Sequence, residues 1–73
     1  MIDKKELGLS IKQVRLDYKI EMDEYACILD VSKRSLRNIE NGISIPSLKT
    51  IINLCNYFSL NIDEFLKLKY LQK

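Results

Sequence analysis

Basic and amide side chains gather in one short stretch of the chain, residues 32–42. Lysine, arginine and asparagine donate hydrogen bonds to phosphates and to the acceptor edges of guanine and adenine. Four of them stand here, at Lys33, Arg34, Arg37 and Asn38. Spacings of three and four residues place them on one face of a helix. This face is suited to binding nucleic acid; the alternative is an ordinary solvated helix surface.

The same stretch marks both ends of a helix. Ser32 is a favoured N-cap, because its hydroxyl accepts from a first-turn backbone N–H. Asn41-Gly42 readily takes the left-handed conformation that ends a helix. Leu36 and Ile39 lie on the face opposite the basic residues and must pack against something. The sequence therefore predicts a short amphipathic helix over residues 32–41.

Composition narrows the class of protein. The 73 residues allow one domain, and a hydrophobic fraction of 47% suffices for a compact helical core. Cys27 and Cys55 fit neither a metal-ligand spacing nor a disulfide framework, so we expect reduced thiols, no metal and no cofactor. The absence of histidine and of a glycine-rich phosphate loop argues against an enzyme. No apolar run spans a bilayer and the N-terminus lacks a signal-peptide core, so we expect a cytoplasmic protein with no membrane partner.

The distribution of charge is more informative than the net charge of +2. Residues 21–30 carry no base and four acids, which are Glu21, Asp23, Glu24 and Asp30. Acids suit the positive end of a helix dipole. An acidic segment beside the basic stretch also predicts modest non-specific affinity for polyanions.

Two helices are expected before the basic stretch. Apolar periodicity predicts one over residues 10–19, with Ser10 as its N-cap and Gln13 as a capping-box partner. Residues 1–9 would form an arm ahead of it, and residues 10–66 the domain. A second helix is expected over residues 22–29. It leads into a three-residue turn, where Asp30 tolerates a left-handed backbone.

Two more helices are expected after the basic stretch. Pro46 can open a fourth helix that runs to about Phe58, with an apolar stripe that we interpret as core. The stripe consists of Leu48, Ile51, Ile52, Leu54, Cys55 and Phe58. Asn61 and Glu64 form a capping box for a fifth helix, which continues into an extension over residues 67–73. There Leu68 and Leu71 would form a dimer contact; the alternative is a frayed helix on a monomer.

Four short sequence motifs occur in a distinctive order within residues 10–66. They are Glu-Tyr-Ala-x-x-Leu-Asp-Val-Ser, Ile-Glu-Asn-Gly, Pro-Ser-Leu and Leu-Asn-Ile-Asp-Glu-Phe-Leu. Their order and spacing resemble the Cro/cI-type helix-turn-helix family, also called the Xre family, of bacterial and phage repressors. The resemblance implies a compact, all-α, five-helix domain like that of lambda repressor. Its second and third helices would form the helix-turn-helix, and residues 32–41 would be the recognition helix in the major groove.

The resemblance also implies roles for individual residues. Base-reading side chains correspond to Lys33, Arg34 and Asn38, with a contribution from Arg37. An ion pair between Arg15 and Glu40 would hold the first helix onto the recognition helix, and we favour this role for Arg15 over a DNA contact. Contacts to the DNA backbone are expected at Met22, Ser32, Ser35, Asn41 and Lys49.

The chain departs from the family pattern at several positions. Met22 stands where a glutamine commonly donates to a phosphate, and a thioether cannot donate. Glu21 replaces a serine or threonine cap, and its charge would repel the phosphate backbone of DNA. Ile43 and Ile45 occupy a loop that is often basic; we expect them either to fold under the domain or to meet a second subunit.

We therefore weigh three functions. The first is a sequence-specific DNA-binding transcriptional regulator, a phage-like or mobile-element-like repressor that binds a pseudo-palindromic double-stranded operator as a homodimer. The alternative is a protein-interaction module, such as an antitoxin or antirepressor target, with weak DNA binding. Salt dependence separates the two, because phosphate-anchored binding falls steeply with salt. An enzyme is a distant third, and no small-molecule substrate is expected.

Overall fold

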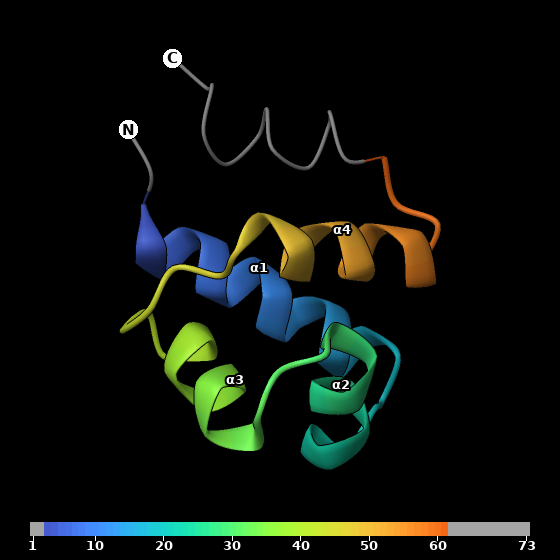
Figure 1. The fold of residues 1–73 in the computed structure, drawn as a ribbon, viewed down its shortest axis with the longest axis horizontal. Helices are drawn as coiled ribbons and strands as arrows, with labels where there is room; N and C mark the ends of the chain where they lie inside the picture. Colours follow the sequence, from blue (N-terminus) through green and yellow to red (C-terminus); the bar gives the residue numbers. More distant parts are fainter. Residues whose placement is uncertain (1–2, 62–73) are drawn as a thin grey trace.

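The computed structural model describes residues 3–61, which form four helices and the connections between them. These helices are α1 (Lys4–Asp17), α2 (Met22–Leu29), α3 (Lys33–Glu40) and α4 (Leu48–Tyr57). Figure 1 shows α2 and α3 together at the lower end of the domain, with α1 and α4 above them. The expected all-α class is confirmed. The predicted fifth helix, with Glu64, Leu68 and Leu71, lies outside the described residues.

The start of α1 differs from the prediction. The helix begins at Lys4 and not at Ser10, so residues 4–9 are helical where an arm was expected. The Asp3 carboxylate is the N-cap, accepting from the backbone N–H groups of Lys5 at 3.0 Å and Glu6 at 3.2 Å. Leu7 is fully buried, one helical turn before the equally buried Ile11. This extra turn forms because Asp3 caps it and Leu7 anchors it in the core.

The helix-turn-helix itself follows local signals. The predicted bounds of α2 are confirmed, and Asp30 at its C-cap has a left-handed φ of 60°. The Ser32 hydroxyl caps α3 by accepting from the Ser35 backbone N–H at 3.0 Å. Asn41 is the C-cap of α3, and Gly42 follows with a φ of 77°, a conformation that glycine adopts without strain. The ends of α3 were therefore predicted correctly.

Tyr25 of α2 is the largest side chain in the core. Its ring is fully buried, and its hydroxyl donates to the backbone carbonyl of Ile11 in α1 at 2.6 Å. Burial, followed by the charge of Glu40, raises the pKa of Tyr25. The ring lies edge-on to Phe58, with centroids 6.2 Å apart. Around it lie further buried apolar side chains: Leu7, Ala26, Leu29, Leu36, Ile39 and Leu54.

The N-terminus of α4 also corrects the sequence prediction. Ser47 is the N-cap and accepts from the Thr50 backbone N–H at 3.2 Å, so Pro46 precedes the helix instead of opening it. Leu48 and Ile52, expected in the core, are exposed. They lie one turn apart, at the edge of the helix face that carries the buried residues, because α4 packs along one side only. The apolar stripe that α4 buries in the core is therefore narrower than the stripe predicted from the sequence.

Candidate nucleic-acid interface

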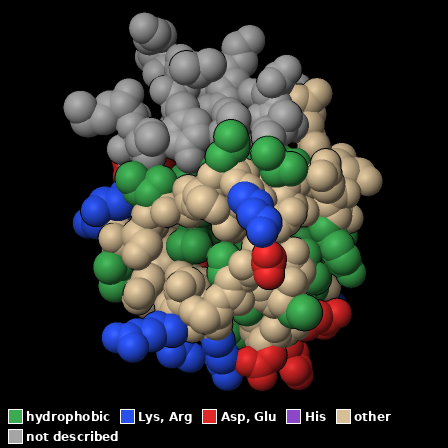
Figure 2. All heavy atoms as spheres, viewed as in Figure 1, with side chains coloured by type: hydrophobic (Ala, Val, Ile, Leu, Met, Phe, Trp, Pro, Cys, Tyr) green, Lys and Arg blue, Asp and Glu red, His purple; other side chains and the backbone are tan. Residues whose placement is uncertain are grey.

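The outer face of α3 carries the basic side chains that the sequence singled out. Lys33, Arg34 and Arg37 are exposed, and Asn38 is half-buried. Figure 2 shows Lys and Arg side chains gathered at the lower edge of the molecule, with acidic side chains beside them. Arg34 and Arg37 form no ion pair with any other residue in the range 3–61. Their guanidinium groups are therefore available to an external acceptor such as a phosphate or a guanine edge.

An ion pair fixes the far end of this helix. Arg15 of α1 binds Glu40 at the end of α3 through two hydrogen bonds, Nε to Oε2 at 2.8 Å and Nη2 to Oε1 at 3.0 Å. The Glu40 side chain is almost completely buried. Its hydrogen bond raises the pKa of the Arg15 guanidinium. The structure thus contains the ion pair that the resemblance implied, and a bidentate pair of this kind fixes orientation as well as distance.

Backbone contact between α1 and α3 lies beside this ion pair. A Cβ atom built on Gly8 would lie well inside 3.0 Å of the Ile39 carbonyl oxygen and 3.3 Å from that of Glu40. The absence of a side chain at Gly8 is what lets the end of α3 approach α1 so closely. Sequence analysis missed this residue because it placed residues 1–9 in an arm. The buried residues Leu7 and Ile11, spaced by one helical turn, were the signal that could have revealed it.

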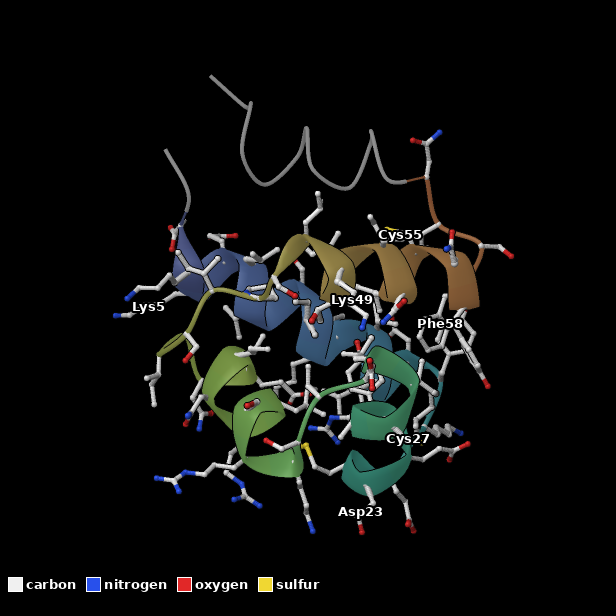
Figure 3. All side chains as sticks on the ribbon, viewed as in Figure 1. Lys5, Asp23, Cys27, Lys49, Cys55 and Phe58 are labelled. Carbon is white, nitrogen blue, oxygen red and sulfur yellow. The ribbon has the colours of Figure 1, made fainter. Side chains whose placement is uncertain are left out.

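Both ends of α2 hold a lysine from another element. Lys33 Nζ lies 3.1 Å from Asp23 Oδ1, and Lys49 Nζ lies 3.1 Å from Asp30 Oδ2. Figure 3 labels Asp23 at the lower tip of α2 and Lys49 on α4. The two lysines were predicted as a base contact and a backbone contact, respectively. Sequence analysis recognised the acidic character of α2 but did not pair its carboxylates with these lysines.

The other expected backbone contacts differ in their availability. Ser35 and Asn41 are exposed. Ser32 is exposed too, but its hydroxyl already accepts the N-cap hydrogen bond. Met22 is partly buried and packs against the core. Its role is therefore at least partly structural, which agrees with the lack of a donor at that position.

The loop between α3 and α4 presents its isoleucines to solvent. Ile43 is 61% exposed and Ile45 is 50% exposed, so the expectation that they fold under the domain is wrong. Pro46 takes the buried position in this loop instead. The chain turns at Gly42 with a positive φ, and Ile43 directly after it is exposed. The other expectation, contact with a second subunit, stays a prediction.

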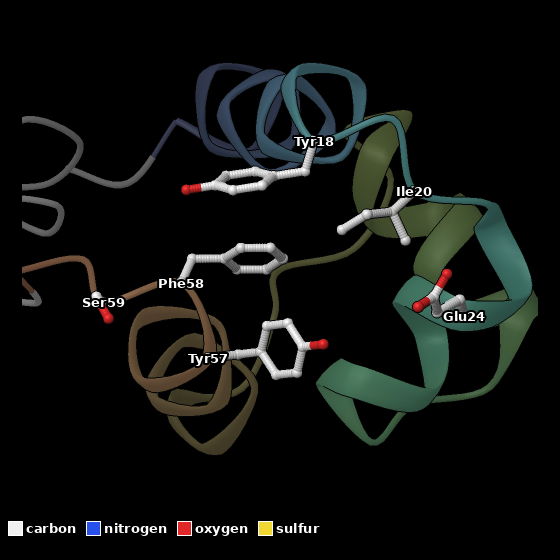
Figure 4. Close-up of a pocket in the computed structure, with 6 residues that line it drawn as sticks. All are labelled: Tyr18, Ile20, Glu24, Tyr57, Phe58 and Ser59. Atoms are coloured by element: carbon white, nitrogen blue, oxygen red, sulfur yellow. The ribbon is translucent and has the colours of Figure 1, made fainter.

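An aromatic groove is lined by side chains from α2, the end of α4 and the segments that follow α1 and α4, and by none from α3 (Figure 4). The Phe58 ring lies between Tyr18, whose ring is tilted by 43° at a centroid distance of 4.6 Å, and Tyr57, whose ring is edge-on at 4.9 Å. Glu24 of α2 lines the same groove. Consecutive carboxylates of α2 therefore have different surroundings, because Asp23 pairs with Lys33 of α3 and Glu24 borders the aromatic rings.

Among residues 3–61, no three histidine, cysteine or acidic side chains come together as a metal ion would require. None of the helices in that range has both the length and the apolar character needed to cross a bilayer. Burial raises the pKa of the Cys55 thiol, whereas Cys27 is exposed.

Known proteins resemble this chain in both sequence and fold. Residues 11–65 match the helix-turn-helix family HTH_3. The chain is 35% identical over 63 residues to the ImmF control region 10 kDa protein of Bacillus phage phi105, covering 86% of this chain and 70% of the phage protein. Its fold is similar to the crystal structure of the clp gene regulator ClgR from C. glutamicum, with a TM-score of 0.74 at 21% identity, over 90% of this chain and 86% of the other. The chain therefore belongs to the Cro/cI-type (Xre) helix-turn-helix family of DNA-binding transcription regulators, which are not enzymes.

Proposed function

We propose that the protein is a sequence-specific regulator of transcription whose α3 enters the major groove of double-stranded DNA. One observation carries the proposal: α3 is fixed at both ends and along its inner face, while its outer face presents two arginines that form no ion pair within residues 3–61. Its N-terminus is capped by Ser32, and its C-terminus is tied to α1 through Arg15 and Glu40. A rigid helix with free guanidinium groups is what direct readout of base edges requires.

Individual roles follow from exposure and chemistry. Arg34 and Arg37 donate to guanine O6 and N7 or to phosphates, and Asn38 pairs with adenine N6 and N7. Lys33 acts as a further base reader at the start of the helix. Ser35 and Asn41 are exposed beside them and contact the sugar-phosphate backbone.

We further propose that the protein acts as a homodimer on a pseudo-palindromic operator. Two recognition helices about one turn of DNA apart, roughly 34 Å, would read two half-sites. The exposed Ile43 and Ile45 supply apolar surface for the subunit contact. The phage relative carries the name of a control-region protein, which supports a role as a small phage-like repressor.

The proposal is tested by selecting binding sites from a pool of random duplexes at near-physiological salt. The wild-type protein is compared with the double variant Lys33→Ala/Arg34→Ala. Lys4→Ala/Lys5→Ala is the matched control, because it removes the same charge from exposed positions at the start of α1.

We expect the wild type and the control to enrich the same inverted repeat and the recognition-helix variant to enrich none. If wild type and both variants enrich no sequence, specific DNA binding is refuted. A single half-site without a repeat would keep DNA binding and refute the dimer.

A second function, docking of a partner protein, is favoured by one observation. Ile43 and Ile45 are exposed in the loop that follows α3, where they offer apolar surface to a partner. An apolar interface weakens little with salt, whereas phosphate contacts lose affinity steeply. If the protein enriches no DNA sequence, replacing Ile43 and Ile45 by serine in a partner-capture assay becomes the decisive comparison.

A further inference from the structure

The first turn of α2 holds two carboxylates with the same charge and different neighbours. Asp23 Oδ1 lies 3.1 Å from Lys33 Nζ, which begins the recognition helix. Glu24 lines the aromatic groove with Tyr18 and Tyr57. One carboxylate therefore belongs to the proposed DNA-binding face, and its neighbour in sequence does not.

The Asp23–Lys33 pair is open to solvent. Their side chains are 75% and 51% exposed, respectively. Exposed ion pairs contribute little to stability, so a strong ligand can replace either member. A phosphate that approaches Lys33 would meet the Asp23 carboxylate as well. The ion pair therefore contributes little to folding stability, and its main effect is on which ligands can bind next to Lys33.

Phosphates and base edges are affected differently by this carboxylate. A lysine ammonium has three donors, so Lys33 can keep Asp23 as one partner and donate to a base as well. Guanine O6 and N7 are neutral acceptors and do not repel a carboxylate strongly. A phosphate is an anion, and at short range it is repelled by Asp23 or must displace it.

We infer that Asp23 is a specificity-determining residue, which keeps Lys33 from serving as a general phosphate contact and directs it to base edges. This inference rests on the proposed DNA-binding function. Non-specific binding is made almost entirely of phosphate contacts, so Asp23 lowers it more than it lowers binding to an operator. A second pair of the same length, Lys49 with Asp30 at the other end of α2, shows the same arrangement of carboxylate and lysine.

The test compares Asp23→Asn with Glu24→Gln as the matched control. Both acids lie in the first turn of α2, so each substitution removes one charge and weakens the same helix-dipole interaction. Asp23→Glu keeps the charge and serves as the conservative rescue. The probes are a labelled 24-base-pair duplex of mixed sequence and the duplex enriched by the wild-type protein from a random pool. Affinity for each probe is measured over a range of salt concentrations.

We expect Asp23→Asn to bind the mixed duplex about fivefold more tightly, the effect of one unit charge at short range in water. Its log affinity should fall more steeply with log salt, by about 0.9, the slope of one added phosphate contact. Affinity for the enriched duplex should rise less than twofold. The specificity ratio, which is the affinity for the enriched duplex divided by that for the mixed duplex, therefore falls. Glu24→Gln should change the slope and the ratio little, and Asp23→Glu should behave like wild type.

Two outcomes separate this inference from the function on which it rests. If the wild type enriches an operator but Asp23→Asn and Glu24→Gln change affinity and slope alike, only net charge matters and the inference is overturned. Weaker binding of the mixed duplex by Asp23→Asn overturns it as well. If the wild type binds enriched and mixed duplexes equally at every salt concentration, the proposed function itself fails.

Discussion

Replacement of Gly8 by alanine should destabilise the protein, although the glycine lies inside a helix. A Cβ at this position would meet the backbone carbonyl oxygens of Ile39 and Glu40 at the end of α3. A backbone oxygen cannot swing aside as a flexible side chain can. The whole C-terminal turn of α3 must therefore move away from α1.

Two opposing effects decide whether Gly8→Ala raises or lowers the free energy of unfolding. An alanine in place of a helical glycine contributes about 1 kcal/mol of favourable propensity. Forcing an extra carbon into a packed contact costs about 1–3 kcal/mol, and the upper end applies because the obstruction is backbone. We expect a net loss of about 1–2 kcal/mol. For a domain of this size that corresponds to a fall in melting temperature of roughly 5–15 °C.

Urea titration and thermal unfolding of the purified variant give the measurement. Ser10→Ala is the control, since Ser10 lies in the same helix and forms no side-chain hydrogen bond with any other described residue. It should leave stability nearly unchanged or raise it slightly. If Gly8→Ala stabilises the protein by about 1 kcal/mol, it behaves as an ordinary helical glycine, and the close approach of α1 and α3 is wrong.

Further predictions concern the buried polar groups. Glu40→Gln leaves the Arg15 guanidinium without its counterion and should cost about 3 kcal/mol in urea unfolding, whereas a cost below about 1 kcal/mol would contradict the structural role of the pair. Tyr25→Phe removes the hydrogen bond to the Ile11 carbonyl and should cost about 1 kcal/mol. Burial raises the pKa values of Tyr25 and the Cys55 thiol, so the unfolded chain loses these protons first as the pH rises. The free energy of unfolding should therefore fall above pH 9.0, by at most about 1.4 kcal/mol per pH unit for each group. Tyr25→Phe should flatten that fall above pH 10.0, and an unchanged slope would exclude Tyr25 as its source.

The helix-turn-helix could be predicted from the sequence because its signals are local. Ser32 caps a helix whose first turn lies within three residues, and Asp30 takes a left-handed conformation that few residues tolerate. The alternation of Leu36 and Ile39 with basic residues then decides which face of α3 is buried. Each of these effects depends on neighbours within one helical turn, so the local amino-acid sequence alone specifies them.

The approach of α1 to α3 could not be predicted in the same way. Gly8 is a poor helix former, and only the nearby backbone of α3 explains its presence in α1. The pairing of Arg15 with Glu40 joins residues 25 positions apart, and it was expected only because the sequence resembles a known family. Contacts between elements require their relative placement, which local periodicity does not contain.

The sequence by itself determined the two helices of the motif, the turn between them and the basic face of α3. Tertiary structure alone decided that Ile43, Ile45 and Leu48 face solvent, and that Asp23 holds Lys33. The physical reason is the range of the interactions. A cap or a turn is formed between adjacent residues, whereas exposure and ion pairing depend on which distant segments the packed core brings together.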